Sequence, residues 1–122
     1  MNNKENILKD KSFAFALRIV KAYRHLTEDK KEYVLSKQLL RSGTAIGALV
    51  REAECAQSAP DFINKMSVGL KEANETEYWL LLLNKSGFID NEVFNSIILD
   101  CKELLKLLIS TINTSKKKIQ KK

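Results

Sequence analysis

Four basic residues at helical spacing are the part of the sequence that most directly suggests chemistry. No acidic residue stands between Lys11 and Glu28, so a helix here would carry basic groups of one sign on the side opposite its apolar residues. Such a face can bind the phosphates of a polyanion without sequence preference. An ordinary solvated helix face explains the same pattern, and both interpretations stay open. The candidate nucleic-acid contacts are Lys11, Arg18, Lys21 and Arg24, supported by Arg41 and Arg51.

The formal net charge of +6 is unevenly distributed along the chain. Five of the positive charges belong to lysines near the C-terminus. Without them, 16 basic residues face 15 acidic ones, a net charge of +1. The sequence therefore predicts one domain with a nearly neutral folded body, 8–113, and a basic, disordered tail, 114–122. A basic balance of this kind is weak evidence for nucleic-acid binding.

Combinations of residues that support catalysis or metal binding are not evident. The single histidine, His25, lies on a charged helix side where no Ser-His-acid triad can be built. Cys55 and Cys101 are isolated in helical patterns and are expected to be reduced core residues. We therefore predict a protein that is not an enzyme and needs no metal or cofactor. It is expected to be cytoplasmic, without a signal peptide or a membrane span.

The composition favours long helices, because 122 residues contain one proline and four glycines. Apolar residues at a period near 3.6 predict helices over 8–26, 31–57, 60–85 and 91–113. Ser58 and Asp61 have capping-box spacing around Pro60, and Gly87 is a predicted helix stop. Short polar links make consecutive helices antiparallel neighbours. The predicted fold class is all-α, an up-down-up-down four-helix bundle.

The second predicted helix combines an apolar stripe with very small neighbours. Gly43 and Gly47 lie four residues apart, although glycine within a helix costs about 1 kcal/mol relative to alanine. Their position predicts that another helix backbone approaches closely. The predicted core stripe is Leu35, Leu39, Ser42, Ile46, Leu49, Val50 and Ala53.

The third predicted helix is apolar on all sides over 78–83, which requires cover on more than one side. A second subunit is the expected cover, although a central place in a monomer is the alternative. Glu77 falls within the main apolar face and is expected to be buried beside Arg41, Arg51 or Lys37. The predicted oligomer interface consists of Val68, Glu72, Glu75, Trp79, Leu82 and Leu83.

Several segments together resemble a known family. They are RSGTAIGA at 41–48, DF at 61–62, KEANETEYWL at 71–80 and GFI at 87–89. In this order they are similar to bacterial four-helix bundle proteins encoded within intervening sequences of large-subunit ribosomal RNA genes. The accessory variability determinant of diversity-generating retroelements is also similar. The resemblance covers about 13–108.

The resemblance implies a ring-like homopentamer, and in the retroelement relatives a partnership with nucleic acid and a reverse transcriptase. Our leading hypothesis is a non-enzymatic homo-oligomer with weak, non-specific binding of RNA or DNA. The alternatives are a protein-interaction scaffold without nucleic acid and a ribonuclease. The last rests on Arg18 and His25, whose spacing resembles the Arg-x4-6-His motif of helical HEPN ribonucleases.

Overall fold

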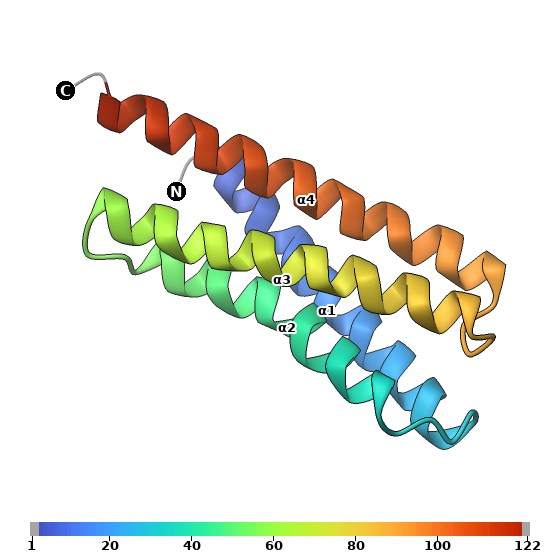
Figure 1. The fold of residues 1–122 in the computed structure, drawn as a ribbon. Coiled ribbons are helices and arrows are strands. Elements are labelled where there is room, and N and C mark those ends of the chain that lie inside the picture. Colours follow the sequence, from blue (N-terminus) through green and yellow to red (C-terminus); the bar gives the residue numbers. More distant parts are fainter. Residues whose placement is uncertain (1–2, 121–122) are drawn as a thin grey trace.

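The computed structural model describes residues 3–120, which form an antiparallel four-helix bundle and confirm the predicted fold class (Figure 1). Its helices are α1 (Asn3–Glu28), α2 (Leu35–Glu54), α3 (Ala59–Lys85) and α4 (Asn91–Gln120). Helices adjacent in sequence pack side by side, and α1 also contacts α4. The contact between α1 and α4 is the least extensive of the four. Within residues 3–120, no Cα atoms of the diagonal pairs α1–α3 and α2–α4 come within 8 Å of each other.

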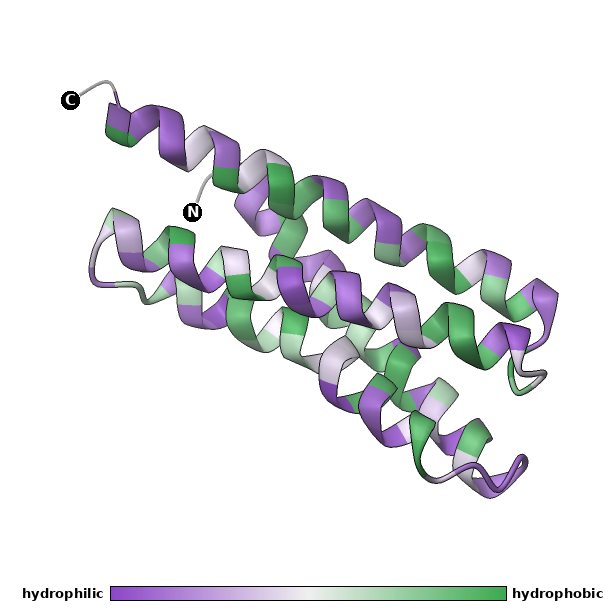
Figure 2. Cartoon of the chain, in the orientation of Figure 1, coloured by the Kyte–Doolittle hydropathy of each residue, from purple (hydrophilic) through white to green (hydrophobic). Residues whose placement is uncertain are grey.

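Each helix contributes apolar residues to one continuous core (Figure 2). The predicted α2 stripe is confirmed at its centre, where Leu39, Ile46 and Val50 are fully buried, while Leu35 and Leu49 are half-buried. The dehydration of these side chains is the main term that favours the folded bundle. The other fully buried large side chains include Phe15, Ile19, Leu26, Met66, Leu80, Leu83, Leu104 and Leu108.

The two glycines of α2 lie where α1 approaches closely, as their spacing predicts. A Cβ atom added at Gly43 would stand 2.7 Å from Ile19 Cγ1. At Gly47 it would stand 3.3 Å from the backbone oxygen of Ser12. A side chain at Gly43 would therefore displace Ile19, and one at Gly47 would press on the α1 backbone.

The helix boundaries follow local capping chemistry. Ser58 Oγ accepts a hydrogen bond from the Asp61 amide at 3.1 Å, which confirms the predicted N-cap of α3. Asp61 Oδ2 accepts from the Gln57 amide at 3.3 Å instead of returning to Ser58. Gly87 adopts φ +85° after α3, a backbone conformation that suits glycine at a helix end.

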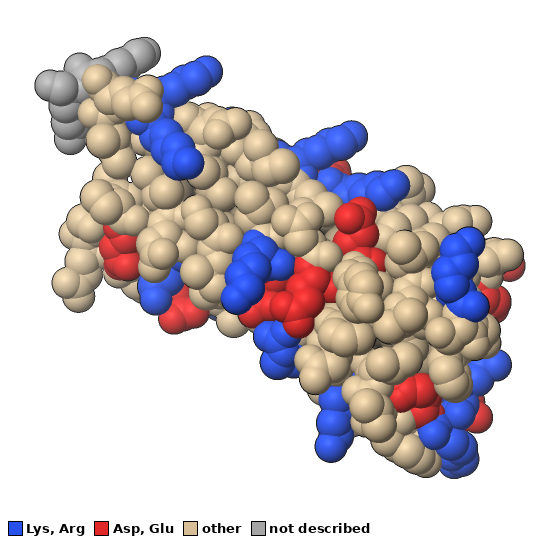
Figure 3. All heavy atoms as spheres, viewed as in Figure 1, with Lys and Arg blue, Asp and Glu red and all other residues tan. Residues whose placement is uncertain are grey.

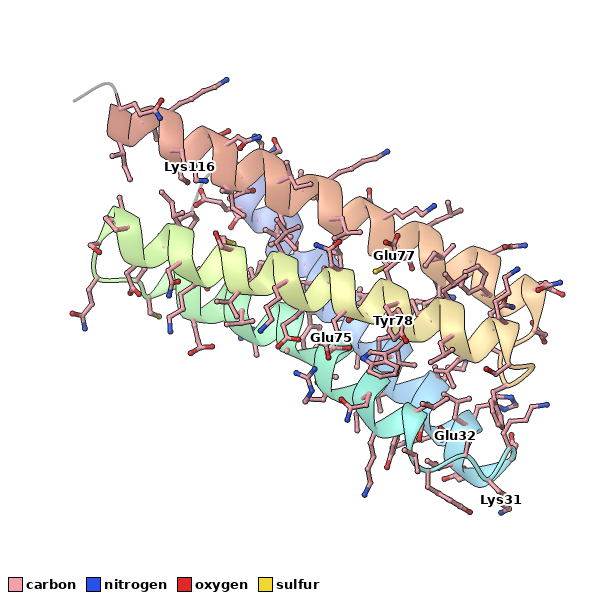
Figure 4. The ribbon with its side chains drawn as sticks, in the orientation of Figure 1. Lys31, Glu32, Glu75, Glu77, Tyr78 and Lys116 are labelled. Carbon is pink, nitrogen blue, oxygen red and sulfur yellow. The ribbon has the colours of Figure 1, made fainter. Side chains whose placement is uncertain are left out.

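The start of α2 differs from the prediction, because residues 31–34 form a turn before the helix. Lys31 has φ +57°, which interrupts a helical path. The buried carboxylate of Glu32 then accepts hydrogen bonds from the amides of Val34, Leu35 and Ser36 at 2.7–2.9 Å (Figure 4). These bonds satisfy the free amides at the first turn of α2.

Helices α1 and α4 are both longer than predicted. The first begins at Asn3, so 3–6 are helical, and α4 continues to Gln120, so 114–120 are helical as well. Lys4 Nζ donates to Ser110 Oγ at 2.8 Å and to Thr114 Oγ1 at 3.2 Å, which joins the two extensions. The remaining terminal residues, including Lys121 and Lys122 of the predicted tail, lie outside the described residues.

Candidate interaction surfaces

The predicted basic stripe lies partly in the seam between α1 and α4. Lys11 Nζ stands 3.1 Å from Glu103 Oε1, and Arg18 Nη1 stands 2.6 Å from Asp100 Oδ2. Arg18 also donates to Ser96 Oγ at 3.1 Å. The stripe has one sign along the sequence, but acids of α4 neutralise two of its four members in space. These two side chains therefore link α1 to α4 and are not free to bind a polyanion.

The other two members of the stripe remain available. Lys21 and Arg24 are exposed, and neither has an acidic partner among residues 3–120. Arg51 lies over the Phe13 ring, with its guanidinium carbon 5.7 Å from the ring centroid. An arginine above an aromatic face makes a favourable cation–π contact. The predicted support from Arg51 thus belongs to the outer surface of α1 and α2.

Arg41, a predicted nucleic-acid contact, lies against the predicted oligomer interface on α3. Its guanidinium donates to both oxygens of Glu72, at 3.2 and 3.1 Å, and to Glu75 (Figure 4). Trp79 Nε1 donates to the same Glu75 oxygen at 3.3 Å. The hydrogen bond to Glu72 raises the pKa of Arg41. Burial would raise the pKa of Glu75, but hydrogen bonds from Trp79 and Arg41 outweigh it and lower that pKa.

The predicted α3 interface separates into inner and outer residues. Leu83 is fully buried in the protomer, so its assignment to a subunit interface is wrong. The turn after α3 folds over this end, since the amides of Phe88 and Ile89 both donate to the Leu83 carbonyl. Val68, Glu72, Glu75, Trp79 and Leu82 are half-buried.

Two apolar side chains beside this stripe are more exposed than its predicted members. Tyr78 and Leu81 stand on the outward side of α3, with 56% and 45% of their surface exposed. The Tyr78 ring meets the Trp79 ring edge-on, with centroids 5.0 Å apart. The sequence had shown that 78–83 is apolar all round, but the outermost residues only emerge once the bundle axis is known. We name Tyr78, Leu81 and Leu82 the α3 patch.

Glu77 corrects a second prediction about α3. It is only half-buried, and within the described part of the chain it pairs with none of the cations expected for it. Its side chain extends toward α4 instead (Figure 4). Burial, followed by the nearby Glu77 charge, raises the pKa of the Cys101 thiol to about 12. Cys101 is the expected buried thiol, whereas Cys55 is exposed, contrary to expectation.

A groove of about 430 Å³ opens between α1 and the start of α4. Arg18, Lys21 and His25 form its basic side, and its lining also includes Ile89, Val93 and Ile97. His25 Nδ1 lies 2.8 Å from Asp29 Oδ2. Arg18 and His25 therefore share one groove, but an acid already engages each of them.

Unpaired lysines cluster on α4. Lys102, Lys106 and Lys116–Lys118 are exposed and have no carboxylate partner within residues 3–120. Basic side chains project along the α4 edge in Figure 3, whereas acidic ones gather between α2 and α3. The predicted tail lysines thus stand on an ordered helix.

The described residues form neither a metal-binding cluster nor a membrane-spanning helix. Across 3–120, no three His, Cys, Asp or Glu side chains gather in a way that could hold a metal ion. The four helices are too polar in every long stretch to cross a bilayer.

Comparison with known proteins places the chain in a family. A family model described as 23S rRNA-intervening sequence protein matches residues 4–110. A crystal structure of a protein of unknown function, from the S23 ribosomal protein family of Bacteroides thetaiotaomicron, is 58% identical in sequence. It superposes with a TM-score of 0.89 and covers 90% of this chain and 98% of that one. No curated protein matches. These matches show that the chain belongs to the 23S rRNA-intervening sequence protein family.

Proposed function

We propose that this protein is a non-enzymatic scaffold that assembles with copies of itself through α3. The α3 patch carries this proposal. Tyr78, Leu81 and Leu82 are one helical turn apart or less, and they stay at least partly exposed after the protomer has formed its core. Scattered exposed apolar residues are normal, but a contiguous group favours a protein interface. The family's intervening-sequence description agrees with an accessory role and names no reaction.

The patch can be tested by the double substitution Tyr78→Asp with Leu81→Asp. Both residues are exposed, so helicity by circular dichroism should stay close to wild type while sedimentation velocity shows smaller species. Leu99→Asp is the matched control, because Leu99 is a 66% exposed leucine on α4. We expect this control to sediment as wild type does. An unchanged sedimentation coefficient in the double variant would remove the proposed interface.

A second candidate function is weak, non-specific binding of RNA or DNA. The observation that favours it is the set of unpaired lysines on α4, together with Lys21 and Arg24 on α1. Repetition of a weak site around an oligomer would raise its effective affinity. The affinity should fall steeply with salt, because bound phosphates release counterions.

Two variants separate the candidate basic surfaces. Truncation after Asn113 removes Lys116–Lys118, and Lys21→Glu with Arg24→Glu reverses the free part of the α1 stripe. We expect binding to a labelled RNA at about 50 mM salt, where screening is weak, to survive in a variant that has lost a surface the RNA does not contact. Sedimentation should show that each variant keeps the wild-type assembly. If the intact protein does not bind RNA, only the proposed scaffold function remains.

The ribonuclease alternative rests on Arg18 and His25. Both are held by acids, and their shared groove is lined partly by Ile89, Val93 and Ile97. The proposal of a non-enzymatic protein predicts that wild type and His25→Ala leave a labelled RNA equally intact. Cleavage by wild type that is lost in His25→Ala would overturn it.

A further inference from the structure

The groove between α1 and the start of α4 exists because the polar seam between these helices stops short of the bundle end. Lys4, Lys11 and Arg18 follow one another at intervals of seven residues, and each reaches an oxygen of α4. His25 is the next residue in this series, but its ring pairs with Asp29 on α1 itself. Figure 1 shows the two helices diverging toward the end of α1. The seam is therefore open over the last turns of α1, and the groove of about 430 Å³ lies there.

Apolar side chains form the floor and one edge of the groove. Ile89 and Ile97 line it and have only 5% and 2% of their surface exposed, so they form its floor. Val93, four residues from each of them, stays 45% exposed at the rim. Ala22 lines the α1 side, where its short side chain leaves the space open. A groove of this size with apolar walls can enclose the apolar part of a small ligand, whose dehydration favours binding.

Positive groups line the inner end of the groove. Hydrogen bonds to Ser96 and Asp100 hold Arg18 at this end, away from the start of α4. These two bonds use only part of the guanidinium, which has five N–H donors. Lys21 follows Arg18 by three residues on α1, and it has no carboxylate partner among residues 3–120. The inner end therefore offers a ligand an ammonium group and spare guanidinium donors.

The acidic groups around the groove are already engaged. Asp100 and Asp29 each pair with a basic residue of the lining. Among the described residues that line the groove, Asp90 is the one acid, and its Oδ1 accepts from the Val93 amide at 2.9 Å. Asp90 also lies at the outer end of the groove, because α4 begins at the next residue. A negative charge on a ligand is therefore favoured beside Lys21 and disfavoured at the outer end.

We propose that the groove binds a small carboxylate with an apolar body. The carboxylate lies at the inner end and accepts hydrogen bonds from Lys21 and Arg18. The apolar body lies along Ala22, Val93 and Ile97. One unpaired ammonium group matches a single negative charge better than the double charge of a phosphate monoester, which the nearby acids would repel. This site does not depend on the proposed self-assembly, because it uses no residue of the α3 patch.

A series of straight-chain carboxylates tests the site on the full-length protein. Butanoate, hexanoate and octanoate share one headgroup and differ only in apolar length, whereas octylamine reverses the charge at constant length. Amide chemical shifts in NMR titrations should change around Ala22, Ile89 and Val93. We expect the dissociation constant to fall about fourfold for each CH₂ group that becomes buried. Equal affinities along the series, or an octylamine that binds this groove as well as octanoate does, would overturn the proposal.

Two substitutions separate the headgroup contact from the apolar contact. Lys21→Ala removes the free ammonium group and should weaken octanoate binding about two- to fivefold, as expected for an exposed ion pair. Val93→Asp places an acid at the rim and should abolish detectable binding. The matched controls are Lys102→Ala and Leu99→Asp, which change exposed residues of α4 outside the groove and should bind as wild type does.

The outcomes of the substitutions decide whether octanoate occupies this groove. All four replace exposed residues, so helicity by circular dichroism should match that of wild type. Aspartate at Val93 also suits the first turn of α4, because a negative charge is favourable at a helix N-terminus. Unchanged octanoate affinity in Val93→Asp would overturn the proposal. An equal loss of affinity in the control variants would show that octanoate binds the surface generally, and would overturn it too.

Discussion

Helix α1 meets its two neighbours in different ways. Toward α2 it packs against glycines, with the Ile19 side chain over Gly43 and the Ser12 backbone over Gly47. Toward α4 it is joined by long side chains, with Lys4, Lys11 and Arg18 each reaching an oxygen of α4. The first seam excludes water through close packing, whereas the second spans its gap with partly exposed polar bridges.

This difference indicates which basic residues have structural roles. Lys4, Lys11 and Arg18 follow one another at intervals of seven residues, and His25 continues the line into the groove. Residues seven apart lie nearly on one side of a helix. The basic stripe is therefore largely a consequence of the polar α1–α4 seam. Lys21 and Arg24, which lie off that line, are the better candidates for an external partner.

The largest effect on stability is expected in the apolar core of the bundle. Ile46 is fully buried on α2 beside the small residues that leave little room for relaxation. Ile46→Ala should lower the free energy of unfolding by on the order of 2–5 kcal/mol. Urea denaturation followed by circular dichroism measures this change. A midpoint equal to that of wild type would show that this position contributes little to the core.

Smaller changes in stability, opposite in sign, are expected when two glycines are each replaced by alanine. Alanine at Gly43 gains about 1 kcal/mol in helix propensity but must displace Ile19, an overpacking that costs roughly 1–3 kcal/mol. At Gly69 the nearest atom to an added Cβ is Leu108 Cδ2 at 3.6 Å, which is an ordinary contact. Gly43→Ala should therefore destabilise the protein and Gly69→Ala stabilise it. Stabilisation by both would contradict the close α1–α2 approach.

The polar seam should tolerate substitution better than the glycine seam. The Lys11–Glu103 and Arg18–Asp100 pairs are about 40–50% exposed at their side chains, and pairs of this kind contribute about 0.2–1 kcal/mol. Lys11→Met and Arg18→Met should each cost no more than that in urea denaturation. A loss as large as that of Ile46→Ala would show that these bridges hold the bundle together.

The smallest effect concerns the loss of stability in acid as Glu75, the partner of Arg41, becomes protonated. The folded-state pKa of Glu75 is lowered from its ordinary value of 4.5. Its contribution to stability is therefore present above pH 4.5 and is lost as the pH falls through the folded-state pKa. Arg41→Met should flatten the fall in stability below about pH 4.5, and Glu75→Gln should flatten it similarly. Parallel pH profiles for wild type and both variants would contradict this pairing.

The sequence predicted the helices well where local signals act alone. The expected span of α3, 60–85, differs from the observed helix by one residue at its start, because Ser58, Pro60 and Gly87 mark its ends. The start of α2 was missed because Glu32 caps it from a turn that periodicity does not reveal. The end of α4 was missed because a run of lysines was taken for a tail, although lysine favours helices.

The candidate surfaces were less predictable because they depend on distant residues. Arg18 and Asp100 are 82 positions apart, so no local pattern shows that they pair. Leu83 is different, because it stands three residues after the buried Leu80 and seven after the buried Thr76, so the spacing along α3 alone accounts for its burial. Glu77 falls inside the α3 apolar arc on a helical wheel, yet its carboxylate leaves the core toward α4.

The most direct test of self-assembly is the mass of the full-length protein in solution. Native mass spectrometry or sedimentation equilibrium over a range of concentrations would provide it. Because we propose that a second copy covers the α3 patch, we predict a mass that is a whole-number multiple of the protomer mass. A protomer mass at every concentration would contradict self-assembly, since the α3 patch would then remain in water without a partner.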